Sequence, residues 1–579
     1  MPVPRTVHTT QTPTPSARAH ALAVLRIRGT ALALALLPAA VAVVLHTAAG
    51  TWSLGPGWDA LRWAVTALAV VTLCVTAGTA AVIARARPAV SPTVPVERSQ
   101  APDLYTLVRH LAERLDVPVP SAIALTPDCD SWLEDRTHPA QEDRTGDRGG
   151  PRWWPKRGRS RTPPVLVIGS PFLWWMRVAE LRALLAPVVA GTGPSAHPDI
   201  SAARRCVRGL DAAVALADRA RAGDASAVSG SGIGILRRAV LRFTGVPARV
   251  LLRACGPHAA EMERGVAAAA ADRAQHVDRA LRTTAQEQVG LAYAGWDRLL
   301  TRVALPAWQV GRWPSRLDAG VVAALTDLSR RDRLADGFAS RLEERPACDL
   351  LEEPGAADAA ISLLAARLFH GEPRPASDGS GGWSPVDWPE YPEEVVDRTW
   401  RIGAARLFTA LDADRPPTAV EHGGAPAVGG ERVSPSESAV TRIIDRLSAG
   451  AHRDALAARL VADVAREEAA RDARPAAAGP ESADGWQPSP MGLPLRPPRT
   501  GRELLAEHIT AAVCCAALDT ADAAAGLDWL DGPVLLVRGE RVTDLAAPVR
   551  ELVEDGDPES LRLWLSTHGI RADKPVRLV

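Results

Sequence analysis

The chain has 579 residues, enough for more than one domain, and its 67 basic and 67 acidic residues give no formal net charge. Arginine outnumbers lysine 65 to 2, which is typical of a GC-rich genome, and no basic patch with interleaved aromatic residues favours nucleic-acid binding. The 7 cysteines are scattered, odd in number and without C-x-x-C spacing, which argues against a disulfide framework or a thiolate zinc site and fits a reducing compartment.

Two uncharged segments near the N-terminus predict a membrane hairpin. Residues 29–58 and 63–84 contain no Asp, Glu, Lys or Arg, and each supplies the roughly 20 residues that cross a bilayer. We predict spans at about 30–49 and 63–84 within a hairpin of residues 29–87, after a cytoplasmic disordered segment of residues 1–28. A signal peptide followed by a single anchor is the alternative.

Arginines at both ends of the hairpin predict its orientation. Arg18, Arg26 and Arg28 precede the first span, and Arg85 and Arg87 follow the second. Basic residues remain on the cytoplasmic side of a membrane. The sequence therefore predicts a multi-pass protein of the cell membrane, with its N-terminus and its soluble body in the cytoplasm.

The soluble body begins after a Pro-rich linker at residues 88–101. Leucines at helical spacing predict an amphipathic helix: Leu104, Leu107, Leu111 and Leu115. A short strand is predicted at residues 121–125. Residues 128–163 are polar and rich in Asp, Glu, Arg and Gly, which predicts an inserted, disordered loop.

A strand, a turn and a helix are predicted between residues 165 and 191. The β-branched run from Val165 ends in Gly-Ser-Pro, and the next segment places Val178, Leu181 and Leu185 on one helical face. This order resembles the HtpX-like, CAAX-protease-like membrane zinc metallopeptidases (peptidase family M-forty-eight). In that family a strand of the form L-x-I-G-x-P-L-L precedes the zinc box in E-L-x-A-V-L-A-H-E-x-x-H.

In register with that motif, the zinc box falls on residues 187–191 of this chain. Pro187, Val188 and Gly191 stand where the family has its first histidine, its glutamate and its second histidine. A zinc peptidase needs two imidazoles one helical turn apart and a carboxylate base. The three residues here have no side-chain donor atoms. Proline also costs about 3 kcal/mol inside a helix, so the helix is predicted to end at Pro187.

The third ligand of the resembled family is lost as well. It is a glutamate in an E-x-x-x-D motif, whose best match here keeps Asp272 but has Ala268 at the ligand position. The resemblance covers about residues 102–370 and implies a gluzincin-like α+β domain that is degenerate as a peptidase.

A rearranged zinc site is the alternative. None of the 13 histidines has another four residues away, so the only tight group of possible ligands is His258, Glu261 (or Glu263), Asp272 and His276. The same residues are more typical of a polar face on a helix that begins near His258.

Peptide binding does not require the metal. In the resembled family the strand before the zinc helix forms the sheet edge along which an extended substrate pairs. The resemblance thus implies an edge strand made of Val165, Leu166, Val167 and Ile168. Coverage of this edge by the inserted loop is the alternative. Residues 235–255 are apolar but interrupted by five arginines, which predicts either an interfacial helix or a packed soluble one.

The C-terminal third is predicted to contain two regions. Residues 371–500 combine helical segments with disordered linkers, and residues 501–579 form a small α+β module. In this module a helix begins near Arg502, a hairpin turns at Gly539, and two short helices follow.

The predicted fold is therefore mainly α with a small β-sheet: a transmembrane helical hairpin, a gluzincin-like domain and the C-terminal module. The resemblance implies a pseudopeptidase without a cofactor that binds the lipid bilayer and a protein partner as a scaffold. An active zinc endopeptidase with displaced ligands is the alternative.

Overall fold

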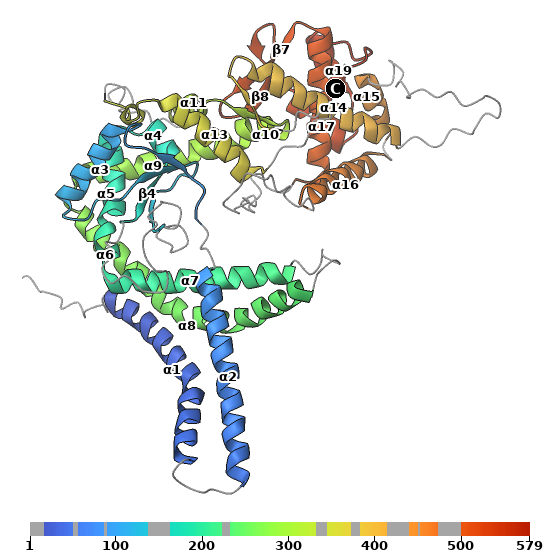
Figure 1. The fold of residues 1–579 in the computed structure, drawn as a ribbon. Coiled ribbons are helices and arrows are strands. Elements are labelled where there is room, and N and C mark those ends of the chain that lie inside the picture. Colours follow the sequence, from blue (N-terminus) through green and yellow to red (C-terminus); the bar gives the residue numbers. More distant parts are fainter. Residues whose placement is uncertain are drawn as a thin grey trace, which may run out of the picture.

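A computed structural model describes residues 17–49, 56–85, 90–136, 163–222, 232–331, 344–371, 382–413, 439–449, 452–472 and 499–578 (Figure 1). Over these residues the chain is mostly helical, with small sheets and two apolar helices at its N-terminal end. Most of the predicted inserted loop and most of the predicted C-terminal linkers lie outside the described residues, as do residues 1–16.

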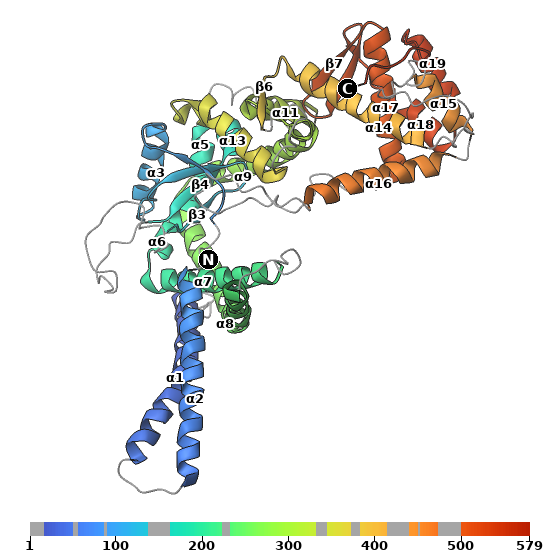
Figure 2. The same ribbon diagram turned by 45° about the vertical axis from the view of Figure 1, so that its right-hand side comes forward.

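The two N-terminal helices, α1 (Ala17–Ala49) and α2 (Pro56–Arg85), extend together away from the rest of the molecule (Figures 1 and 2). By length and composition both can cross a membrane, over Ala17–Thr47 and Trp58–Ile83. Large apolar side chains along them are exposed, as at Leu34 (70%). The prediction of disorder is wrong for residues 17–28, because this part of α1 is helical and buries Ala21 and Val24 completely.

Two long helices, α7 (Pro198–Ala222) and α8 (Gly232–Ala274), cross one end of the hairpin (Figure 1). They bury the start of α1 in a shared core that includes Ala203 and Met262. Helix α8 contains the arginine-interrupted stretch at residues 235–255. It begins well before His258, so the helix start predicted there is wrong.

A four-stranded sheet in the order β1-β2-β4-β3 forms the centre of the soluble body. Strand β4 pairs parallel with β2 and antiparallel with β3, and β1 pairs antiparallel with β2. The strands are β1 (Val94–Val96), β2 (Ile123–Thr126), β3 (Trp132–Glu134) and β4 (Val165–Gly169). All residues of β2 and β4 are buried, which is typical of parallel strands covered on both faces.

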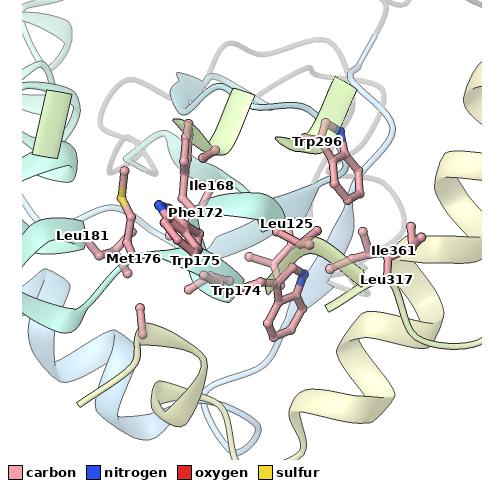
Figure 3. Packing of buried hydrophobic residues seen from close by; sticks show 14 of the residues in the cluster. Leu125, Ile168, Phe172, Trp174, Trp175, Met176, Leu181, Trp296, Leu317 and Ile361 are labelled. Carbon is pink, nitrogen blue, oxygen red and sulfur yellow. The ribbon is translucent and has the colours of Figure 1, made fainter. Parts of the chain in front are cut away.

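Helices cover this sheet and complete the first core. They are α3 (Pro102–Arg114), α4 (Ser170–Trp175), α5 (Val178–Ala190), α6 (Thr192–Ser195), α9 (Arg279–Leu299), α10 (Leu305–Gln309), α11 (Leu317–Arg331) and α13 (Pro354–Phe369). Figure 3 shows Phe172, Trp174 and Trp175 of α4 packed among Leu125 and Ile168 of the sheet. The buried Trp175 indole donates to the Gln288 side chain of α9 (2.8 Å), which ties the two helices together.

The remaining elements of the first core are short. They are a π-helical turn η3 (Leu300–Ala304), a parallel pair of strands β5 (Arg312–Pro314) and β6 (Ser384–Val386), a 3₁₀ turn η4 (Ala347–Leu350) and a second π-helical turn η5 (Pro392–Asp397). The buried Tyr391 hydroxyl donates to the Val303 carbonyl (2.5 Å) and so joins the two π-helical turns. Strand β6 lies inside the region predicted to be a linker.

A second core lies toward the C-terminus (Figure 1). It combines α14 (Arg398–Ala413), α15 (Val440–Ser448), α16 (Arg453–Asp472), α17 (Gly501–Thr520), α18 (Ala546–Glu554) and α19 (Glu559–Thr567) with strands β7 (Ala523–Asp528), β8 (Gly532–Val537) and β9 (Glu540–Arg541). The predicted helix from Arg502, the turn at Gly539 (φ +81°) and the two short helices are confirmed. Strand β7 was not predicted, and α14 to α16 share the core of the C-terminal module.

Candidate functional site

Helix α5 contains residues 187–190 and ends at Gly191, so it covers the positions that the sequence resemblance aligns with a zinc box. It follows β4 and α4, and it begins where the Glu180 carboxylate accepts a hydrogen bond from the Arg177 backbone N–H (2.9 Å). Glu180 is buried and its carboxylate satisfies a free N–H at the helix start, as in a capping box. At the end of β4, a Cβ atom on Gly169 would lie 2.3 Å from the Asp128 carbonyl oxygen, so only glycine fits there.

The helix does not end at Pro187, and this prediction is wrong. Helix α5 continues to Ala190, and the N–H of Gly191 still bonds to the carbonyl of Pro187 (3.2 Å). Pro187 lies on the exposed face, where water can bond the carbonyl that loses its partner. Leu185 and Val189, on either side of it, are completely buried in the first core and hold the helix in place.

The zinc-box positions therefore lie on an intact helix without ligands. Pro187 is exposed, Val188 is half-buried and Gly191 is buried at the C-terminal end of α5. Helix α5 packs against α8, where Ala268 and Asp272 are exposed while Ala270 is buried. The two helices that the resemblance assigns to metal binding are thus neighbours in space, and their ligand positions carry proline, glycine and alanine.

The alternative ligands are not brought together. His258 and Glu261 lie one turn apart on α8, but Asp272 is 14 residues further along than His258, about 21 Å at 1.5 Å per residue. The Nδ1 atom of His258 instead lies 3.4 Å from that of His20 on α1, and His276 Nδ1 lies 2.8 Å from the Arg273 carbonyl. Within the described ranges, no group of three or more His, Cys, Asp or Glu side chains could hold a metal ion.

Strand β4 is not an edge strand, and the predicted peptide-binding edge is wrong. Val167 pairs with Ala124 of β2 on one side and with Trp132 of β3 on the other. Strand β3 belongs to the first part of the predicted inserted loop, so the insertion covers β4, as the alternative stated. The edge beyond β4 is β3, whose three residues are all half-buried.

One buried carboxyl group was missed by the sequence analysis. Asp358 is completely buried, and one of its oxygens accepts the Asp318 backbone N–H at the start of α11 (3.1 Å). Burial, and next the neighbouring Asp318 carboxylate, raise the pKa of Asp358 to about 9. The available signal was that Asp358 is the only acidic residue of α13, whose other residues are apolar apart from Ser362 and Arg367.

The cysteines of the soluble body are poor nucleophiles. Burial, and next the carboxylates of Asp128 and Asp130, raise the pKa of the Cys129 thiol. Burial likewise raises the pKa of the Cys514 thiol inside α17. A thiol that stays protonated neither attacks a carbonyl carbon nor binds a metal readily.

Comparisons with known proteins add no identification. No protein-family model, no curated protein and no solved structure matches the chain. The candidate site is the α5–α8 pair, which carries Pro187, Val188, Gly191 and Ala268 at the positions where the resemblance implies the base and the zinc ligands.

Proposed function

We propose that the chain is a membrane-anchored, non-catalytic homologue of the HtpX-like peptidases that binds a protein partner as a scaffold. The observation that carries the proposal is the occupancy of the zinc-box positions. An intact α5 follows a parallel strand and packs against α8, yet presents Pro187, Val188 and Gly191 where a peptidase needs two imidazoles and a carboxylate.

The proposed absence of bound zinc and of peptidase activity is tested on the purified full-length protein in detergent. We expect less than stoichiometric zinc by elemental analysis and no cleavage of unfolded protein substrates. About one zinc per chain, lost in His258→Ala or His276→Ala, would contradict the proposal and favour the active peptidase with displaced ligands.

A rebuilt zinc box tests the peptidase-like arrangement itself. Pro187→His, Val188→Glu, Gly191→His and Ala268→Glu together restore the family's ligands. A Cβ at Gly191 would meet the Val188 carbonyl oxygen at 3.0 Å and the Leu133 side chain at 3.4 Å, so the end of α5 must shift slightly to accept the histidine. If α5 and α8 lie as in the resembled peptidases, the fourfold variant should bind about one zinc per chain that a chelator removes. The matched control lacks Ala268→Glu and should bind zinc more weakly. A fourfold variant that binds no more zinc than the wild type would reject the resemblance.

We propose two membrane spans with the N-terminus and the soluble body in the cytoplasm. The two apolar helices and the arginines at their outer ends support this orientation. A reporter that is active only outside the cytoplasm should be inactive when fused after Pro88 and active when fused near Ser53. The opposite pattern would reverse the topology.

The partner surface is assigned to the C-terminal module, because β4 lies inside its sheet. Leu563 of α19 is 69% exposed, although its neighbours Leu561 and Trp564 are buried. In native membranes, Leu563→Asp should reduce cross-linking to a protein partner while the unfolding temperature stays unchanged. Ala547→Asp, at an exposed position of α18, is the matched control. Identical cross-linking of the wild type and both variants would remove this surface from the proposal.

A further inference from the structure

We propose that one face of α8, formed by Val246, Val250, Ala254 and Pro257, lies on the lipid bilayer at the boundary between headgroups and acyl chains. We call it the α8 membrane face. Anionic lipid headgroups are the occupant that the arginines around it would bind. The inference rests on the membrane hairpin of the proposed function, and it adds a second contact between the protein and the membrane.

The first observation is an apolar stripe without a protein partner among the described residues. Val246 and Val250 are 54% and 58% exposed, and they stand four residues apart, on one side of the helix. Ala254 and Pro257 are exposed and continue the same side. On the opposite side of α8, Ala248 and Cys255 are buried in the core shared with α1 and α7.

The second observation is the position of this stripe in the molecule. Helix α8 packs against both α1 and α2. In both views it lies on the side of α7 toward which the hairpin extends (Figures 1 and 2). On α1 the exposed large apolar side chains begin at Leu32. The α8 membrane face therefore continues the apolar surface of the hairpin at the end where the hairpin enters the body.

The two crossing helices differ in the residues that they expose. Helix α7 lies farther from the hairpin loop than α8 does (Figures 1 and 2). It exposes Asp211 and Asp218. Asp218 also binds Arg249, which holds this arginine against α7. Exposed valines on α8 and exposed carboxylates on α7 are the distribution expected of a helix pair of which α8 is the one that contacts a bilayer.

Exposed arginines near the α8 membrane face predict that it prefers anionic lipids. Arg253 is exposed on α8, and Arg26 and Arg28 are exposed on α1. The negative surface potential of an anionic bilayer attracts arginine side chains near its surface. The guanidinium of arginine also matches the geometry of a phosphate group. Phosphatidylglycerol or a similar anionic lipid is thus the expected neighbour.

The test measures the depth of single nitroxide labels in the full-length protein reconstituted into vesicles. Exposed Cys74 is first replaced by alanine, and this background without a new cysteine gives the residual labelling. Labels at Val246→Cys and Val250→Cys should collide with oxygen several-fold more often, relative to a water-soluble nickel complex, than a label at Asp211→Cys on α7. The contrast should be larger in vesicles that contain phosphatidylglycerol than in phosphatidylcholine alone, and Arg253→Gln should reduce that difference.

A label at Val43→Cys separates the failure of this inference from the failure of the proposed function. Val43 is exposed in the apolar part of α1 and should favour oxygen if the hairpin is embedded. Nickel accessibility at Val43 would overturn the membrane hairpin and with it the inference. Oxygen preference at Val43, together with nickel preference at Val246 and Val250, would overturn the α8 membrane face alone. Equal depth in both lipid mixtures would overturn the assignment of anionic headgroups.

Discussion

Asp358 makes the stability of the soluble body depend on pH. Its pKa is raised from an ordinary value of 3.8 to about 9, so the folded protein binds a proton that the unfolded chain releases at neutral pH. The free energy of unfolding contributed by this group is therefore fully present below about pH 4 and is lost as pH rises toward about 9.

Asp358→Asn should remove this dependence. The amide oxygen can still accept the Asp318 N–H, and the side chain carries no charge to bury. We expect the variant to be more stable than the wild type at about pH 8, by an amount on the order of a few kcal/mol, with the two proteins converging near pH 4. Unfolding temperature against pH measures the effect. Parallel curves for the two proteins would contradict the assignment.

At the residue scale, the sequence predicts which side chains lack donor atoms, but it predicts less well the backbone conformation where tertiary packing determines it. The absence of donor atoms at Pro187, Val188 and Gly191 follows from the sequence alone. The course of the helix through Pro187 does not, because the cost of about 3 kcal/mol is offset by the burial of Leu185 and Val189 in a core that the sequence pattern does not reveal.

At the scale of elements, the position of β4 between two strands determines how much a proline substitution in β4 destabilises the protein. Val167→Pro removes a backbone donor inside the sheet and places a ring where β2 and β3 both approach. We expect a loss of at least about 1–3 kcal/mol in the free energy of unfolding, the cost of leaving a buried hydrogen-bonding group without its partner, measured by chemical denaturation. Val167→Ala loses side-chain burial but keeps the N–H, so it serves as the matched control. A proline variant no less stable than the alanine variant would show that Val167 lies at a free edge.

Elements with a clear local sequence pattern were predictable. Strands that are extended only because they pair with a neighbouring strand were not. The strand at Val165 and the helix at Arg502 follow from their local patterns. Strand β3 has three residues inside a polar stretch, too few for an alternating pattern. Strand β7 reads Ala-Ala-Ala-Gly-Leu-Asp, whose alanines favour helix, and it is extended because each of its residues pairs with β8.

At the scale of the whole molecule, the β7–β8 hairpin joins the two cores. Its strands place Leu535 in the second core, while Leu530 at its tip is buried in the first. The Trp529 ring stands edge-on to Trp388, with 4.7 Å between ring centroids. Gly532 (φ +87°) approaches the Arg302 carbonyl so closely that a Cβ would lie 2.6 Å from its oxygen. The tip of the β7–β8 hairpin therefore packs closely against the first core.

Trp529→Ala should uncouple the two cores. Loss of the ring removes its buried area and an aromatic pair that contributes about 0.5–1.5 kcal/mol beyond that area. We expect calorimetry to show two thermal transitions that are further apart than in the wild type. Trp529→Phe keeps a ring and should show a smaller separation. An alanine variant that unfolds like the wild type would mean that other contacts join the cores.

If the proposed hairpin spans a bilayer, α1 connects the membrane to the body as one continuous helix. It has 33 residues, about 50 Å at 1.5 Å per residue. Ala21 and Val24 are buried in the core shared with α7 and α8, and the rest of α1 packs along α2. Because one end of α1 is packed into the body, a change in the tilt of α1 also rotates the body. Because apolar helices change their tilt when bilayer thickness changes, lipids with longer acyl chains should swing α1 upright and rotate the attached body against the membrane surface. In the proposed membrane topology, the orientation of the body is therefore expected to change with bilayer thickness.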